Sequence, residues 1–418
     1  MTVPPTDRLS EPERMTSTLA RAVAADRDEF AATFWGRLPL LSRAADLGGP
    51  DGFHDLISSA AVDELLSRRG LRTPFLRVAQ HGKVLPVGQY TGGGGAGAEI
   101  ADQVHDDKVL RLFAGGATLV LQGLHRLWPP VIDFAGRLGA ELRQSLQVNA
   151  YLSPPSSQGF DTHYDTHDVF VLQVEGVKRW RVHPPVLPDP LERQPWGGRA
   201  DEVGATAEGE PLLDVELHPG DALYLPRGWL HSARTESGRS LHLTVGVRAL
   251  TRFDLVEELL TAAAAEPRLR ASLPYGMDVT DLDVVGAELA ATVAALRSWL
   301  LTADPAAIAE RLRERSWVLK RPEPISPMRQ LDFAGALTPD DVIVVRGGLR
   351  WTMTGSGERV TLQLAGRTLE LPASCESAVR MSLDGSPHRV GDLPLPDDAD
   401  RLVLARRLLI EGVLIPEA

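Results

Sequence analysis

The sequence contains a single cysteine, Cys375, and no run of about 18 apolar residues. One cysteine excludes an intrachain disulfide and any cysteine-based zinc cluster, and it favours a reducing compartment such as the cytoplasm. Neither a long apolar run nor an apolar segment behind a basic N-terminal head is present, so the sequence predicts neither export nor membrane insertion.

Basic residues are also scarce, with 44 lysines and arginines against 56 aspartates and glutamates and a formal net charge of −12. This deficit argues against a broad phosphate-binding surface, so direct nucleic-acid binding is not expected. It is compatible with a basic protein partner. The length of 418 residues, with 43% hydrophobic and 24% charged residues, predicts a globular protein of two or three domains.

The residue pattern changes twice along the chain. From about 118 to 249, short β-branched or alternating runs are separated by proline and glycine turns, which predicts an antiparallel barrel or jelly roll. From about 253 to 317, alanine- and leucine-rich helices are expected, packed on the barrel or associating with a second copy. Beyond them, alternating runs and a final helix and strand predict a small α+β domain.

Two segments rich in glycine or proline interrupt this pattern. Thr91 to Glu99 contains four consecutive glycines and is expected to be a mobile connector, because such runs lose much backbone entropy on ordering. Residues 187 to 212 are rich in proline, glycine and glutamate, which predicts an inserted surface loop. Either segment is a plausible wall of a substrate cleft.

Three residues are candidates for a metal centre. His163 and Asp165 are two positions apart, so on a strand they would project from one face. His231 follows a proline-glycine turn on a neighbouring predicted strand and supplies a third ligand. Two imidazoles and one carboxylate leave coordination positions open, an arrangement that suits non-haem iron(II) and oxygen chemistry.

Other histidines leave alternatives open. His105, two residues before Asp107, lies in a polar acidic stretch and is expected to be solvated. His167 would share the face of His163 on a regular strand and could replace one of the ligands. His242, between two leucines, fits either the barrel interior or a hydrogen-bonded structural role.

Oxygen activation also needs two electrons, which a metal-chelating 2-oxo acid would supply. Its far carboxylate requires a cation, since an unpaired buried charge is costly. Lys178 is the candidate, because it follows a Glu-Gly turn and should point away from the face of Arg179, although a surface lysine is the alternative. Tyr151 and Asn149, two apart on the preceding strand, could add hydrogen bonds to the same cosubstrate.

Two long segments carry a family resemblance. NAYLSPPSSQGFDTHYDTHDVFVLQVEGVKRWRVH (149–183) and LHPGDALYLPRGWLHSARTESGRSLHLTVGV (217–247) closely resemble the JmjC-type cupin family of ribosomal oxygenases. TFWGRLPLL (33–41) is similar to that family's N-terminal segment, and the helical and C-terminal parts resemble its dimerisation and winged-helix modules.

The resemblance implies an α+β protein built on a double-stranded β-helix, the cupin or jelly-roll core of JmjC proteins. A helical dimerisation segment and a C-terminal winged-helix-like domain would follow this core. The implied divisions are a mainly helical lead-in that includes part of the core, the catalytic barrel, the helical segment and the winged-helix-like domain, at 1–115, 116–250, 251–317 and 318–418.

The same resemblance implies specific roles. Iron(II) would be bound by His163, Asp165 and His231, the distal carboxylate of 2-oxoglutarate would pair with Lys178, and Tyr151 and Asn149 would lie near cosubstrate and substrate. With O2 as second cosubstrate, a cytoplasmic homodimer would hydroxylate histidine or arginine of a ribosomal or other basic protein. Thr166 departs from the acidic residue that many relatives carry there, which leaves the modified side chain open.

Other functions share these residues. A hydroxylase of a small metabolite or peptide intermediate, a demethylase that hydroxylates an N-methyl group, and a non-catalytic sensory or binding cupin all remain alternatives. The sequence does not identify the partner of the C-terminal domain.

Overall fold

The computed structural model describes residues 17–49, 52–319 and 321–417. The chain divides into two compact units, Met1–Ala249 and Leu250–Ala418. The four predicted divisions of the chain are finer than this and remain a prediction.

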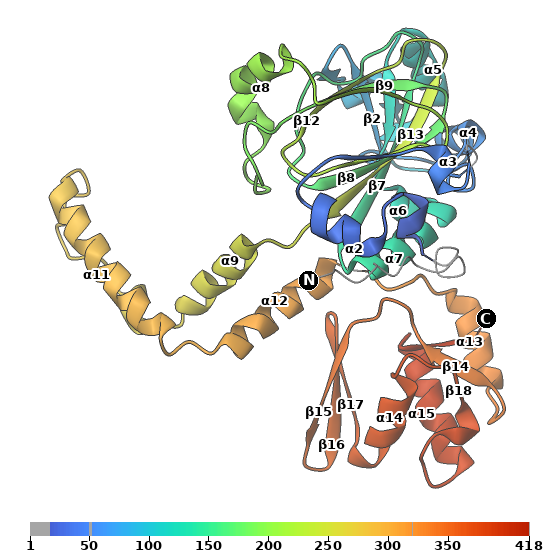
Figure 1. The fold of residues 1–418 in the computed structure, drawn as a ribbon. Coiled ribbons are helices and arrows are strands. Elements are labelled where there is room, and N and C mark those ends of the chain that lie inside the picture. Colours follow the sequence, from blue (N-terminus) through green and yellow to red (C-terminus); the bar gives the residue numbers. More distant parts are fainter. Residues whose placement is uncertain (1–16, 50–51, 320, 418) are drawn as a thin grey trace, which may run out of the picture. The chain divides into compact units, whose positions relative to one another are not determined.

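Two antiparallel sheets form the core of the first unit (Figure 1). The larger sheet contains β1 (Leu40–Ser42), β2 (Leu76–Gln80), β3 (Lys83–Val84), β6 (Thr118–Leu121), β7 (Ser145–Ser153), β8 (Asp168–Glu175), β11 (Ala222–Leu225) and β13 (Ser240–Arg248). Its strand order is β1-β11-β8-β13-β7-β6-β2-β3. The smaller sheet contains β9 (Lys178–His183), β10 (Leu213–Leu217) and β12 (Leu230–Arg234), in the order β10-β9-β12. The predicted antiparallel jelly roll is confirmed.

The central strand β8 explains why its sequence is apolar without interruption. Val169 and Val171 face the smaller sheet and pack with Trp180 of β9. Phe170 and Leu172 face the opposite side, where they join the main hydrophobic cluster of the unit. A strand that is buried on both faces has no solvent-exposed side, so polar and apolar residues do not alternate along it.

Helical elements and a two-stranded ribbon surround the sheets. They are η1 (Leu19–Arg21), α2 (Arg27–Glu29), η2 (Phe30–Phe34), α3 (Ala44–Leu47), α4 (Ser59–Arg68), η3 (Val87–Gln89), β4 (Thr91–Gly92), β5 (Gln103–Val104), α5 (Asp106–Ala114), α6 (Leu124–Leu127), α7 (Pro129–Leu142), η4 (Trp196–Arg199) and α8 (Ala200–Ala207). Helix α7 covers the larger sheet beside β7 and buries Phe134 and Leu138 in the main cluster (Figure 1).

Both segments expected to be loops contain regular structure. Thr91 and Gly92 form β4, which pairs with β5, so the prediction of a structureless connector is wrong at its first two residues. The insertion at 187–212 carries η4 and α8, so its interpretation as a plain surface loop is also wrong. Its short helix has a buried residue, Val203, and a single packing contact of this kind is too sparse a signal to detect from periodicity.

The second unit contains helices and two three-stranded sheets. The helical elements are α9 (Arg252–Ala263), α10 (Pro267–Arg270), α11 (Leu282–Leu300), α12 (Pro305–Leu319), α13 (Pro327–Ala336), η5 (Ala373–Cys375), α14 (Glu376–Ser382), η6 (Val390–Asp392) and α15 (Asp398–Ile410). The strands are β14 (Val342–Val345), β15 (Trp351–Ser356), β16 (Arg359–Leu364), β17 (Arg367–Pro372), β18 (His388–Arg389) and β19 (Leu414–Pro416), in sheets ordered β18-β14-β19 and β15-β16-β17. The predicted helices and the final helix-strand pair are confirmed; the winged-helix-like assignment remains a prediction.

Helices α9 and α12 pack against each other through ion pairs. Arg315 pairs with Asp254 at 2.9 Å and with the buried Glu258 at 3.2 Å, and Arg311 pairs with Glu258 at 3.4 Å. Arg311, earlier in α12, pairs with the later Glu258 of α9, while Arg315 reaches back to the earlier Asp254, so the two helices run antiparallel.

Helix α11 differs from the other long helices in that none of its 19 residues is buried. Leu282, Leu289 and Val293 are 81%, 60% and 47% exposed. Among the described residues no single helix is long and apolar enough to cross a membrane, while α11 and Pro305–Ser316, bent by 96°, pass such a test only as a pair and only on length and composition.

Candidate metal and cosubstrate site

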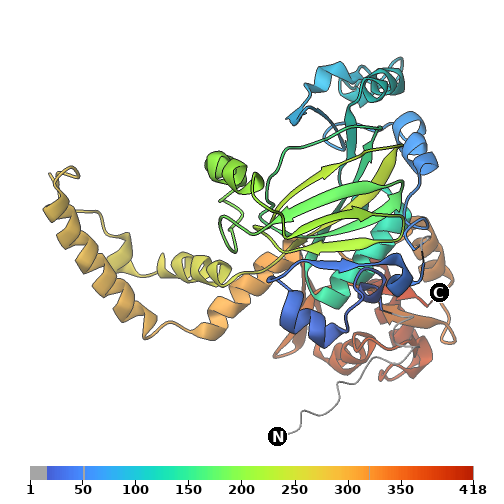
Figure 2. The same ribbon diagram turned by 45° about the horizontal axis from the view of Figure 1, so that its top comes forward.

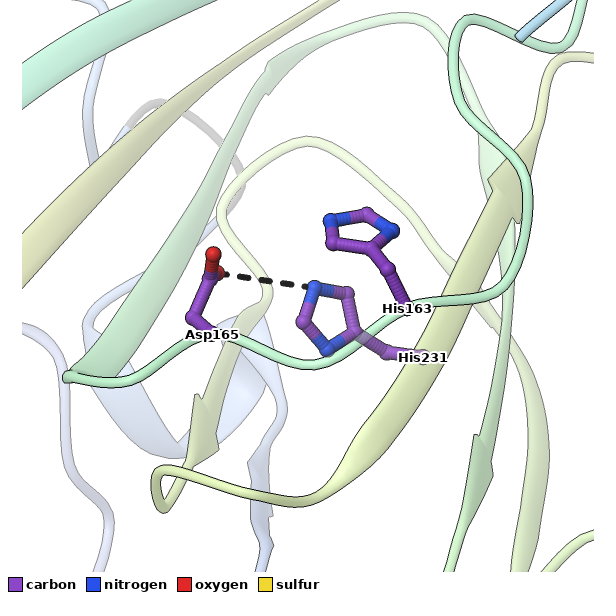
Figure 3. A group of neighbouring side chains, drawn as sticks. All are labelled: His163, Asp165 and His231. Atoms are coloured by element: carbon purple, nitrogen blue, oxygen red, sulfur yellow. Dashed lines mark ion pairs between the residues drawn. The ribbon is translucent and has the colours of Figure 1, made fainter. Parts of the chain in front are cut away.

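Three side chains, two from the segment before β8 and one from β12, converge in the first unit. The ligand atoms of His163, Asp165 and His231 all lie within 4.8 Å of one another. His231 Nε2 is 3.7 Å from Asp165 Oδ2, and the two imidazole centroids are 4.5 Å apart (Figure 3). Within the described residues this is the group with metal-ligand chemistry and spacing.

Backbone carbonyls fix the orientation of both imidazoles. His163 Nδ1 lies 2.7 Å from the carbonyl oxygen of Asp161, and His231 Nδ1 lies 3.0 Å from that of Trp229. A carbonyl can only accept, so each Nδ1 carries the proton and each Nε2 presents a lone pair. Orientation of this kind is typical of histidines that bind metal ions.

The electrostatics keep this group in a cation-binding state. Burial, together with the neighbouring His163, lowers the pKa of His231 to about 4, so its imidazole is neutral near pH 7. Burial tends to raise the pKa of Asp165, but the surrounding histidines outweigh it and lower that pKa. The Asp165 carboxylate and the neutral imidazole of His231 are therefore available to a divalent cation.

The backbone carrying the first two ligands is less regular than predicted. Strand β8 begins only at Asp168, and His163 forms an isolated bridge with His231 through hydrogen bonds of 3.1 and 2.8 Å. The prediction that His163 and Asp165 lie on a regular strand is wrong. The irregularity also turns His167 away, since its Nε2 lies 3.2 Å from the side-chain nitrogen of Gln147 and His167 is outside the three-residue group.

Lys178 lies in the interior of the barrel, as its alternation with Arg179 predicts. It is 3% exposed, whereas Arg179 is exposed and paired with Asp214. Its ammonium donates to Ser153 Oγ at 3.0 Å, and no ion pair of Lys178 occurs in the described part of the chain. Burial without a carboxylate lowers the pKa of Lys178 to about 7.

His242 and Trp180 are site residues that sequence reasoning missed or left open. His242 stacks on Tyr151 with centroids 4.9 Å apart, and Trp180 meets its ring edge-on at 5.5 Å. Neither His242 Nδ1 nor Trp180 Nε1 has a hydrogen-bond partner among the described residues, although both atoms are buried. Burial and the nearby Lys178 keep the pKa of His242 well below its usual value.

Asn149 is placed differently from the other predicted residues. Its Oδ1 accepts a hydrogen bond of 3.1 Å from the backbone N–H of Gly123, which ties the start of α6 to β7. It is not among the residues that line the cavity, whereas Tyr151 is. Burial raises the pKa of Tyr151, so its phenol remains protonated and able to donate.

One cavity connects these groups. It encloses about 590 Å³ including the space at its mouth, and its lining consists of Thr118, Tyr151, Gly159, Phe160, His163, Asp165, Val169, Val171, Lys178, Trp180, His231, Ala233, His242 and Thr244. The metal-type group, which is His163, Asp165 and His231, and the buried ammonium of Lys178 thus share one cavity with apolar walls. Trp180 Nε1 and the Lys178 ammonium, which lack anionic partners within the described ranges, fit an anionic ligand, and the His-Asp-His group fits a divalent metal.

Comparison with known proteins gives consistent relatives. The JmjC domain family matches residues 133–255. The bifunctional lysine-specific demethylase and histidyl-hydroxylase NO66 of Drosophila persimilis is 41% identical over 148 residues, or 34% of this chain and 20% of that protein. Ribosomal oxygenase 1 of Gallus gallus is 29% identical, and the alignment covers 97% of this chain and 73% of that protein. The chain thus spans a fifth of the first relative and about three quarters of the second.

The fold also has a solved counterpart. The ribosomal oxygenase YcfD of Escherichia coli, determined in complex with cobalt and 2-oxoglutarate, superposes with a TM-score of 0.51 at 18% identity. The match covers 95% of this chain and 99% of that one. It confirms the predicted JmjC-type cupin fold.

Proposed function

We propose that this chain, which is similar to the JmjC-domain family and to ribosomal oxygenases, is an iron(II)- and 2-oxoglutarate-dependent oxygenase. Its substrate on this proposal is a histidine or arginine side chain of a ribosomal or other basic protein. Relatives named histidyl-hydroxylase and ribosomal oxygenase support this substrate class. The large acidic excess of the chain is compatible with it.

The observation that carries the proposal is the shared cavity. It is lined at one end by His163, Asp165 and His231 and elsewhere by Lys178, a buried cation without a carboxylate partner in the described part of the chain. A metal site for hydrolysis would not need the buried cation Lys178. A bidentate cosubstrate with a distal carboxylate needs both.

The residues have distinct tasks in this proposal. His163, Asp165 and His231 would hold iron(II) and leave coordination positions for the cosubstrates. When bound, iron(II) with 2-oxoglutarate supplies oxygen activation: O2 delivers one oxygen atom to the substrate and one to the succinate that forms with loss of carbon dioxide. Val169, Val171 and Ala233 provide apolar walls that keep water from this chemistry.

Lys178 would hold the distal carboxylate of 2-oxoglutarate. A carboxylate beside the ammonium restores the charged form that burial disfavours, so binding and protonation reinforce each other. Trp180 and His242 line the same cavity with buried nitrogens that have no partner among the described residues, and Tyr151 lines it with a protonated phenol that can donate. Asn149 supports the wall indirectly, through its bond to Gly123.

Two further proposals concern assembly and location. We propose that the chain forms a homodimer through α11, which exposes the apolar side chains of Leu282, Leu289 and Val293. A reducing compartment, consistent with the single cysteine, is the expected location.

The test is formation of succinate from 2-oxoglutarate by the purified chain. Turnover should require iron(II) and O2 and should be lost in Asp165→Ala and His231→Ala protein. His105→Ala, which changes a histidine bonded to the Gly93 carbonyl outside the cavity lining, is the matched control and should behave as wild type. Unchanged succinate formation in Asp165→Ala would refute the proposal.

A further inference from the structure

We propose that Trp196, carried by the inserted segment 187–212, is a substrate-recognition residue that binds an arginine or lysine of the polypeptide substrate. This arginine or lysine would be a neighbour, in the substrate polypeptide, of the residue whose side chain enters the cavity. This inference rests on the proposed oxygenase function and adds to it a residue that selects the polypeptide.

The position of Trp196 relative to the metal-type group is the first argument. Its ring centroid lies 6.3 Å from that of His163, at an interplanar angle of 50°. Trp196 does not line the cavity and is 37% exposed, whereas Phe160, 6.1 Å from the same imidazole, does line it. Trp196 therefore lies just outside the chamber, within reach of residues that flank an inserted side chain.

The inserted segment is fixed to the residues that surround the ligands. Tyr164, between His163 and Asp165 in the sequence, donates its hydroxyl to the carbonyl oxygen of Gln194 at 2.9 Å. The Tyr164 ring is buried with Val203 of α8 and Leu230 of β12. Figure 2 shows α8 beside the strands of the barrel. The anchor places Trp196 at a defined position next to the site.

A close backbone approach and two ion pairs strengthen this attachment. A Cβ on Gly228, in the turn before β12, would lie 2.6 Å from the carbonyl oxygen of Leu187, so only glycine permits the contact. Arg227 pairs with Asp189 at 3.0 Å, and Arg248 pairs with Glu192 at 2.6 Å. A wall held at several points can present an aromatic face with little loss of entropy on binding.

Charge identifies the partner. The segment from 187 to 212 contains six acidic and two basic residues. Asp189, Glu192 and Glu202 pair with arginines, whereas Glu208 and Glu210 at the end of α8 are exposed. The face of a tryptophan ring attracts cations more strongly than that of any other side chain. A tryptophan face on a segment with a net acidic charge favours a basic peptide over an acidic or purely apolar one.

The experiment compares two synthetic peptides on metal-free protein. Both peptides contain a central histidine. In the first it is flanked by arginines, and in the second by citrullines, which keep the shape of arginine and remove its charge. Fluorescence anisotropy should give tighter binding of the arginine peptide by the wild-type chain. In Trp196→Ala that preference should fall about fivefold, and in Trp196→Phe it should fall less. Tyr275→Ala removes a fully exposed aromatic residue in the second unit and should preserve the preference.

The outcomes separate this inference from the proposed function. An equal preference in wild type and Trp196→Ala, or no binding of the arginine peptide to wild type, would overturn the role of Trp196. If Trp196 were only structural, its replacement by alanine would weaken the binding of both peptides equally and leave the ratio of their affinities unchanged. That result would also overturn the proposed role of Trp196. Because the binding requires no metal, a failure of succinate formation would count against the oxygenase proposal alone.

Discussion

At the scale of single residues, Lys178 is the most informative group in the cavity. Its ammonium is buried, donates to the hydroxyl of Ser153, and has a pKa lowered to about 7. Below this pKa the lysine is charged before the cosubstrate arrives. Above it, binding of a carboxylate must also recruit a proton.

This predicts a pH dependence for the affinity of 2-oxoglutarate. The dissociation constant should rise about tenfold per pH unit above about pH 7, because the charged fraction of Lys178 falls at that rate. Lys178→Arg remains charged throughout and should lose the dependence, while Lys178→Ala should bind weakly at every pH. Calorimetric titration across this range provides the measurement. A pH-independent affinity in the wild type would show that another cation holds the carboxylate.

The metal-type group could be predicted from the sequence more completely than the rest of the cavity. His163, Asp165 and His231 could be found because their residue types and turn context are distinctive. His242 and Trp180 could not be assigned, because their convergence depends on β9 and β13 facing each other across the barrel. The hydrogen bond that diverts Asn149 to Gly123 likewise depends on a loop whose path has no periodic signal.

At the scale of elements, the hairpin between β8 and β9 positions Lys178. Gly176 in this turn has φ +67°, and a Cβ there would overlap the backbone oxygen of Arg239. Gly176→Ala should therefore lower the stability of the chain by more than about 2 kcal/mol, since backbone strain and a backbone clash add.

Gly238 is a matched control for this prediction. Its φ is +74°, but nothing lies within 4 Å of the position that a Cβ would occupy. Gly238→Ala should cost about 1 kcal/mol from the left-handed backbone alone. Thermal unfolding of the full chain should rank wild type above Gly238→Ala and Gly238→Ala above Gly176→Ala. Equal melting temperatures for the two variants would contradict the steric argument.

Helix α11 gives a second prediction at this scale. Leu289 and Val293 lie on one face of the helix, four positions apart, and are 60% and 47% exposed. The double variant Leu289→Asp and Val293→Asp should convert a dimer into a monomer in light scattering, because it places charges in an apolar interface. Leu331→Asp, which changes a leucine 56% exposed on α13, should leave the dimer intact. A monomeric wild type would refute the proposal.

At the scale of the whole molecule, the order of structural classes along the chain was predictable and the details of its loops were not. Period-two and period-3.6 patterns separate the barrel from the helices that follow it, since each pattern records which side of an element is buried. The insertion with Trp196 lacked any such pattern, yet its tertiary contacts with Tyr164 and Gly228 give it an ordered place beside the site.

A prediction at this scale concerns the substrate. Ribosomal proteins from cells that express the chain should be heavier by one oxygen atom at one histidine or arginine than those from cells without it. Intact-protein mass spectrometry, followed by peptide mapping, provides the measurement. Cells that express Asp165→Ala serve as the control and should lack the shift. An unchanged set of masses would exclude ribosomal proteins as substrates.

The most direct measurement of the central claim is an anaerobic titration with iron(II) followed by 2-oxoglutarate, monitored by visible absorption. The wild-type chain should develop the charge-transfer band of a ferrous 2-oxo acid chelate with one iron per chain, and Asp165→Ala should develop none. If the band is absent from the wild type, or equally strong in Asp165→Ala, His163, Asp165 and His231 do not form the site proposed for them.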